Sequence, residues 1–166
     1  HQGNINKKYD WNNLYYACGR CNSIKSYTHK NLLDCCDSNT DVFKSIKCIL
    51  PSIPDKDIEV TSMLDNSNTQ ANNTVRLLKK CYNEQNTPLR GITHSVLKEK
   101  LFEYYTDFIN YRMKIKNKKS TPTEIIYAKE KIHVMLDKKF PFSIFWKWHL
   151  LEDSYLLEKF KKHYPN

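Results

Sequence analysis

The sequence predicts an α+β fold that is mostly helical. Only 3 of the 166 residues are glycine, which suits helices because glycine destabilises helix interiors. In the second half of the chain, apolar residues recur at helical spacing. In the first half, two short apolar stretches flank a pair of prolines and predict strands. We therefore expect an N-terminal core with a small hairpin over residues 1–65, and a helical portion packed on it over residues 66–166.

The composition favours a polyanionic partner. The chain has 27 Lys and Arg against 18 Asp and Glu, a net charge of +9, so its surface attracts nucleic acid before any specific contact forms. No apolar run approaches the roughly 20 residues that span a bilayer, so we expect no membrane partner. The 6 cysteines are spaced unevenly, which predicts a thiolate metal site in a reducing cytoplasm rather than a disulfide framework.

The strands and the first helix are expected in the first half of the chain. Residues 1–9 are polar and predict a loop, whereas residues 11–17 are aromatic and aliphatic and predict a strand. A short helix follows over residues 21–27. Residues 43–50 and 58–63 predict two further strands joined by a proline-bearing turn.

Helices are expected after a polar, Asn-rich linker over residues 66–73. Asn73 or Thr74 is the predicted cap of the first helix, and residues 93–116 form the longest one. Further helices are expected at residues 125–136, from Pro141, and at residues 150–164. The aromatic residues near the C-terminus are assigned mainly to packing.

Residues 10–30 contain the candidate site. Cys18 and Cys21 form a C-x2-C pair, the spacing at which a tight turn directs two thiolates to one tetrahedral zinc. Cys35 or Cys36 could complete the site. A second pair upstream of the chain is the alternative, and we favour it because adjacent cysteines cannot easily both face one ion. Cys48 and Cys81 lie in apolar patterns and are expected in the core.

Two asparagines flank this pair at an interval that suits a strand, a knuckle and the first turn of a helix. The string from Asn13 to Lys25, N-L-x3-C-x2-C-N-x2-K, resembles the second half of the HNH endonuclease motif, in members whose third motif residue is asparagine. The resemblance implies a ββα-metal core and hydrolysis of DNA with Mg²⁺ or Mn²⁺. In that case Asn13 orients the catalytic base and Asn22 helps to hold the metal, while Cys18 and Cys21 bind a separate, structural Zn²⁺.

The family also requires a histidine that deprotonates the attacking water. His1 is the only histidine before Asn13, and it is our candidate. The chain begins on His1 without a methionine, so we expect a longer protein, and the catalytic histidine is either His1 or a residue upstream of it. Arg20, Lys25 and Lys30 are expected near the phosphate backbone, whereas His29 is expected to face solvent.

A short nuclease core joined to a long helical tail resembles the nuclease subunits of bacterial anti-phage systems of the Septu type. That resemblance implies an ATPase partner, for which exposed Trp146 or Trp148 would be anchors. The alternative is a zinc-knuckle module that binds nucleic acid or protein without catalysis. In it, Asn13 and Asn22 only cap turns and helix starts.

Overall fold

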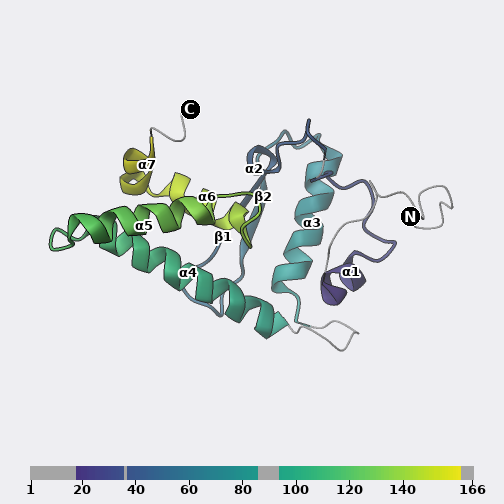
Figure 1. The fold of residues 1–166 in the computed structure, drawn as a ribbon. Helices are drawn as coiled ribbons and strands as arrows, with labels where there is room; N and C mark the ends of the chain where they lie inside the picture. Colours follow the sequence, from purple (N-terminus) through teal and green to yellow (C-terminus); the bar gives the residue numbers. More distant parts are fainter. Residues whose placement is uncertain (1–17, 36, 86–93, 162–166) are drawn as a thin grey trace.

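The computed structural model describes residues 18–35, 37–85 and 94–161. In these parts the protein is α+β and mostly helical, with one two-stranded antiparallel sheet, which confirms the predicted class. The elements in chain order are α1 (Gly19–Lys25), α2 (Val42–Ser45), β1 (Ile46–Ile49), β2 (Glu59–Ser62), α3 (Thr69–Asn83), α4 (His94–Lys116), α5 (Pro122–Met135), α6 (Ser143–Glu152) and α7 (Ser154–Phe160). The hairpin occupies the centre, with α3 in contact with β2 and α6 in contact with β1 (Figure 1).

The predicted hairpin is observed, but its strands are shorter than predicted. Ile46 pairs with Ser62 and Cys48 with Val60 in antiparallel register. The predicted strand over residues 43–50 is wrong at its start, because residues 42–45 form the helical turn α2. The Asp41 carboxylate caps that turn by accepting the Phe43 and Lys44 backbone N–H groups, and this local bonding competes with a strand.

Helix α3 begins earlier than predicted. Its N-cap is Asn68, which accepts the Ala71 N–H at 2.9 Å, so the assignment of the cap to Asn73 or Thr74 is wrong. These two residues instead hold the segment that follows α1. Thr74 Oγ1 accepts the Leu33 N–H at 2.9 Å, and Asn73 Nδ2 donates to the Lys30 carbonyl at 3.1 Å.

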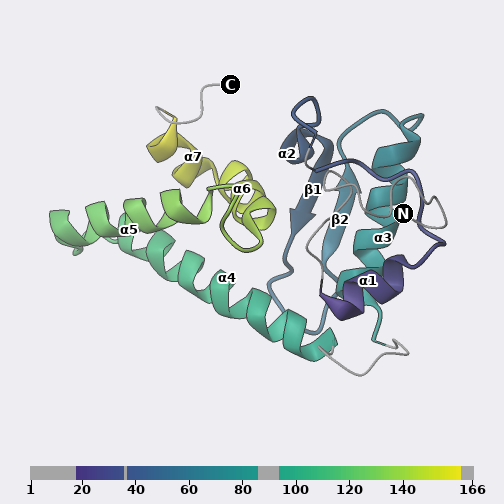
Figure 2. The same cartoon turned by 45° about the vertical axis from the view of Figure 1, so that its right-hand side comes forward.

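The predicted longest helix is confirmed as α4, with 23 residues, which corresponds to a length of about 34 Å. Helix α5 packs antiparallel to it (Figure 2). Thr121 and Glu124 form a capping box at the start of α5 with Pro122 in the first turn, which is the arrangement of a well-defined helix N-terminus.

The aromatic side chains build the core between α4, α6 and the hairpin. Phe108, Phe145 and Trp146 are at most 1% exposed, and the Trp146 indole N–H donates to the Pro141 carbonyl at 2.9 Å. Trp148 is half-buried and donates to the Ile46 carbonyl at 2.7 Å. Their assignment to packing is confirmed, and the suggestion of Trp146 as an exposed docking anchor is wrong.

The two halves predicted from the sequence are in extensive contact. Helix α3 belongs to the predicted helical portion, yet it packs against both β2 and α1. Within residues 18–35, 37–85 and 94–161, no helix is long and apolar enough to cross a membrane.

Candidate functional site

The C-x2-C pair forms a knuckle that opens helix α1. Cys18 is the N-cap, in extended conformation, and its Sγ accepts the Cys21 backbone N–H at 3.4 Å. The Cys18 carbonyl accepts the Asn22 N–H at 3.0 Å. Because the cap orders the first turn, Asn22 occupies a fixed place in a helix that starts directly at the knuckle. The predicted helix over residues 21–27 is thus observed as α1, Gly19–Lys25.

Arg20 fastens α1 to the end of α3. Its side chain is only 2% exposed, and its two terminal amino groups donate to the carbonyls of Cys81 and Glu84. His94, the first residue of α4, contacts the Tyr82 carbonyl through Nε2 at 2.7 Å. A helix leaves its last carbonyls without intrahelical partners, and a cation there also complements the helix dipole. Arg20 and His94 therefore join three helices at one point.

Three thiols meet at this junction. Cys21 is hydrogen-bonded through its side chain both to Cys18 and to Cys81 of α3. The bond to Cys81, followed by burial, raises the pKa of Cys21 above its usual range. The same bond, aided by the nearby Arg20 charge, lowers the pKa of Cys81. Cys81 was expected only as a small core residue; it is 4% exposed and also contacts the knuckle.

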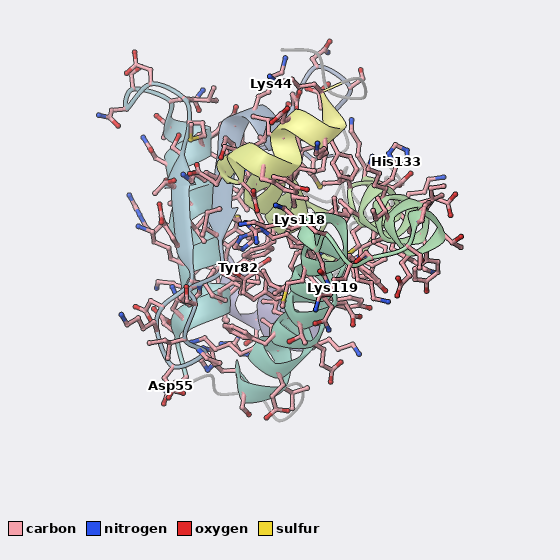
Figure 3. The ribbon with its side chains drawn as sticks, turned by 90° about the vertical axis from the view of Figure 1, so that its left-hand side faces the viewer. Lys44, Asp55, Tyr82, Lys118, Lys119 and His133 are labelled. Carbon is pink, nitrogen blue, oxygen red and sulfur yellow. The ribbon has the colours of Figure 1, made fainter. Side chains whose placement is uncertain are left out.

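A groove of about 540 Å³ runs past these thiols. Its lining is mainly apolar and comes largely from α1, α3 and α4. The side chains that line it include Cys18, Cys21, Asn22, Lys25, Leu77, Leu78, Cys81, Tyr82, Val96, Leu97 and Phe142. Figure 3 places Tyr82 between α3 and the helices opposite, where its ring meets Phe145 edge-on at 5.3 Å between centroids.

The predicted site residues are only partly brought together. Asn22 and Lys25 both line the groove, and Asn22 is exposed. Lys30 is exposed beyond the end of α1. Arg20, predicted as a phosphate contact, has its terminal amino groups engaged by α3 instead. His1 and Asn13 lie outside the described residues.

His29, expected to face solvent, is half-buried. Its pKa is lowered by burial and then by the charges of Lys80 and Arg76 on α3. The ring is therefore neutral near pH 7 and has cations for neighbours. These neighbours also disfavour a metal cation there.

The donors suited to a soft metal are the three thiols at the junction. Cys35 is exposed, and Cys36 lies outside the described residues. In the described parts of the chain, no group of three or more His, Cys, Asp or Glu side chains is arranged so that it could hold a metal ion. Thiolate donors nevertheless match the chemistry of zinc, whereas the exposed amide of Asn22 matches a hard ion such as Mg²⁺.

The basic run after α4 lies far from α1. Lys118 and Lys119 are in the turn between α4 and α5 (Figure 3), at the other end of α4 from the junction (Figure 1). Arg112, at the start of that run, pairs with Asp153. The exposed lysines near α1 and those in this turn thus form separate positive regions.

Sequence reasoning missed Cys81 and His94 as parts of the site. Each is brought to the knuckle region by tertiary packing, and Arg20 and Cys81 are separated by 61 positions. The sequence does show a cysteine, Cys81, near the C-terminal end of a predicted helix. Apolar periodicity alone assigns such a cysteine to the core.

Comparisons with protein-family models, with curated proteins and with solved structures found no match for this chain.

Proposed function

We propose that the protein is a metal-dependent endonuclease of the HNH type that hydrolyses phosphodiester bonds of DNA. The observation that carries this proposal is the knuckle that leads directly into α1, with Asn22 exposed and lining the groove. Asn22 and Lys25 are three positions apart on a helix, so they share one face. A metal ligand and a phosphate-binding cation are thereby presented together.

The proposed roles follow from what each side chain can do. A histidine, for which His1 is the candidate in this sequence, takes the proton of the attacking water, and Asn13 holds its ring by hydrogen bonding. Asn22 is one ligand of Mg²⁺ or Mn²⁺, and because its amide oxygen is neutral, the site also requires a carboxylate. When bound, the metal stabilises the charge that develops on the phosphorus oxygens.

Substrate binding is assigned to Lys25 and Lys30, while Arg20 acts indirectly by positioning α1. The net charge of +9 supports a polyanionic substrate. The same charge motivates the proposal of a controlling ATPase subunit, because an unregulated nuclease in the cytoplasm would damage the DNA of its own cell.

Plasmid cleavage tests the proposal. The protein should nick or cut supercoiled DNA in the presence of Mg²⁺ or Mn²⁺, and EDTA should abolish the cleavage. Asn22→Ala should lower the cleavage rate by at least about 100-fold, a typical loss for removal of one group that acts on the transition state. Asn110→Ala is the matched control, since Asn110 is exposed on α4.

Metal-loaded protein that cleaves neither DNA nor RNA would contradict the proposal. That outcome would favour the second candidate, a zinc-knuckle module that binds nucleic acid or a protein without catalysis. The apolar groove beside the knuckle favours this alternative, because apolar concave surfaces commonly receive partner side chains. A module of this kind would bind DNA or a partner equally well with and without Asn22.

A further inference from the structure

We propose that the end of α4 and helix α7 form a second contact surface for DNA, one that binds the phosphate backbone without reading sequence. Four exposed lysines make up this surface, which we call the lysine patch: Lys116, Lys118, Lys119 and Lys159. The inference rests on the function proposed above in taking DNA as the partner. It adds a binding surface at the other end of α4 from α1 (Figure 1).

One aromatic ring brings lysines of two helices together. Lys116 of α4 and Lys159 of α7 both lie over the ring of Tyr155, with their Nζ atoms at 5.9 and 5.5 Å from its centroid. The dipole of each helix favours a cation in its last turn, but it does not explain why the two cations meet at one ring. Lys118 and Lys119 follow in the turn directly after α4 (Figure 3).

Two further contacts between α4 and α7 hold the scaffold beneath the lysine patch. The Tyr155 hydroxyl donates to the Ile115 carbonyl at 3.1 Å, and Arg112 pairs with Asp153, the N-cap of α7. These contacts fix the two helices to each other, so the positions from which the lysines project are set before a ligand binds. Such preorganisation lowers the ordering cost of binding.

Neighbouring carboxylates do not neutralise the lysine patch. In the parts of the chain that the structure describes, no ion pair joins any of the four lysines to a carboxylate. Glu124 accepts the N–H and the hydroxyl of Thr121 instead. Glu158 precedes Lys159, but adjacent positions on a helix do not face each other. Residues 112–119 contain five Lys and Arg and no Asp or Glu, so the surface complements a polyanion.

The geometry points to the DNA backbone rather than the bases. Because two lysines lie over the Tyr155 ring, its faces do not offer a free platform on which bases could stack. Lysine contacts to phosphate oxygens carry no sequence information. An anionic membrane fits less well, because membrane-surface helices place large apolar side chains beside their cations. Within the described residues, neither α7 nor residues 117–121 expose a large apolar side chain.

The experiment removes two charges of the lysine patch at a time from the full chain. One double variant is Lys116→Gln with Lys159→Gln, and the other is Lys118→Gln with Lys119→Gln. Glutamine keeps a long polar side chain that suits a helix, and circular dichroism checks that each variant is folded. Affinity for labelled DNA duplexes of different sequence is measured by fluorescence anisotropy in EDTA, over a series of salt concentrations.

The matched control is Lys138→Gln with Lys139→Gln, which removes the same charge from exposed positions after α5, at the other end of that helix from the lysine patch. Each patch variant should bind DNA more weakly, to the same extent for every sequence. The slope of log affinity against log salt concentration should decrease in magnitude by about 2, since each lysine–phosphate contact contributes about 1. The control should keep the slope of the unaltered protein.

Slopes that do not differ between the patch variants and the control would overturn the inference, as would an unaltered protein that does not bind DNA. Loss of binding to phosphatidylserine vesicles, with DNA binding retained, would assign the lysine patch to a membrane and also overturn it. Because EDTA is present, these readouts are independent of cleavage. A nuclease with unaltered slopes in the patch variants refutes the inference alone, whereas patch-dependent DNA binding without cleavage refutes the nuclease alone.

Discussion

The junction of α1 with α3 and the aromatic core around α6 are stabilised in different ways. At the junction, directed contacts from Arg20 and His94 satisfy the carbonyls at the end of α3. In the core, apolar rings such as Phe108, Phe145 and Trp146 are removed from water. The difference indicates that the core determines whether the chain folds, whereas the junction determines where the candidate site lies.

Trp146→Ala should have the largest effect on stability. The indole is fully buried against Phe108, at 6.1 Å between ring centroids, and its removal should cost about 3–5 kcal/mol. Chemical denaturation measures the loss. Tyr27→Ala is the control, because Tyr27 is 73% exposed, and it should change the free energy of unfolding by less than about 0.5 kcal/mol.

Trp146→Phe keeps a ring in place should the alanine variant not fold. It removes the donor to the Pro141 carbonyl and should still cost about 1–3 kcal/mol, the typical cost of an unsatisfied buried group. Equal stability of Trp146→Ala and Tyr27→Ala would refute the account of the core.

Acidification should weaken the same core through His149. Its Nε2 accepts the Leu50 N–H at 3.1 Å, and burial lowers its pKa from 6.5 to about 4. The unfolded chain therefore binds a proton at higher pH than the folded chain. Stability from this group is complete above about pH 6.5 and is lost as the pH falls toward 4, by up to about 3 kcal/mol.

Denaturation curves between pH 4 and pH 7 measure this dependence. His149→Gln keeps an acceptor for Leu50 and should flatten the dependence, whereas His133→Gln, on the exposed surface of α5, should retain it. An unaltered pH dependence in His149→Gln would exclude His149 as its source.

Arg20→Met should lower the local stability of the junction and leave that of the core unchanged. The substitution keeps the aliphatic part of the side chain and removes the guanidinium. The carbonyls of Cys81 and Glu84 then lose their donor, at a cost of about 2 kcal/mol. Hydrogen exchange should show lost protection in α1 and the last turn of α3, with α4 to α6 unchanged.

The control is Arg76→Met, which replaces an exposed arginine on α3 and should leave exchange unchanged. Loss of protection throughout the chain in Arg20→Met would contradict the separation of junction and core.

Thr121→Ala should have the smallest effect. It removes one half of the capping box at the start of α5, where Thr121 Oγ1 accepts the Glu124 N–H at 3.3 Å. The cost should be about 1 kcal/mol. Thr123→Ala, in the same first turn but outside the cap, is the control, and an equal effect of both in thermal melts would argue against the capping box.

The same contrast explains which features the sequence could predict. Helix α4 and the start of α5 follow from local rules, since apolar spacing and the Thr121–Pro122–Glu124 signature are read within a few residues. The cap of α3 was misplaced because several asparagines in one run satisfy the capping rule. Asn68 is the cap, whereas Thr74 and Asn73 lie inside the helix and bind residues 30–33.

The site is harder to predict than the fold because its contacts join distant residues. Cys18, Cys21 and Asn22 are recognisable as a group, because they are neighbours in the sequence. The contacts of Arg20 with α3 and of Cys21 with Cys81 depend on tertiary packing, because the hairpin separates α1 from α3 in the sequence.

The central claim is that Asn22, carried by the knuckle helix, holds the metal of a nuclease. The rate of plasmid cleavage as a function of Mg²⁺ or Mn²⁺ concentration tests it most directly, in the full chain with Asn22→Ala beside Asn110→Ala. The account predicts that Asn22→Ala raises the half-maximal metal concentration by about tenfold or more, and that Asn110→Ala leaves it unchanged. Cleavage with the same metal dependence in both variants, or no cleavage by the unaltered protein, would contradict it.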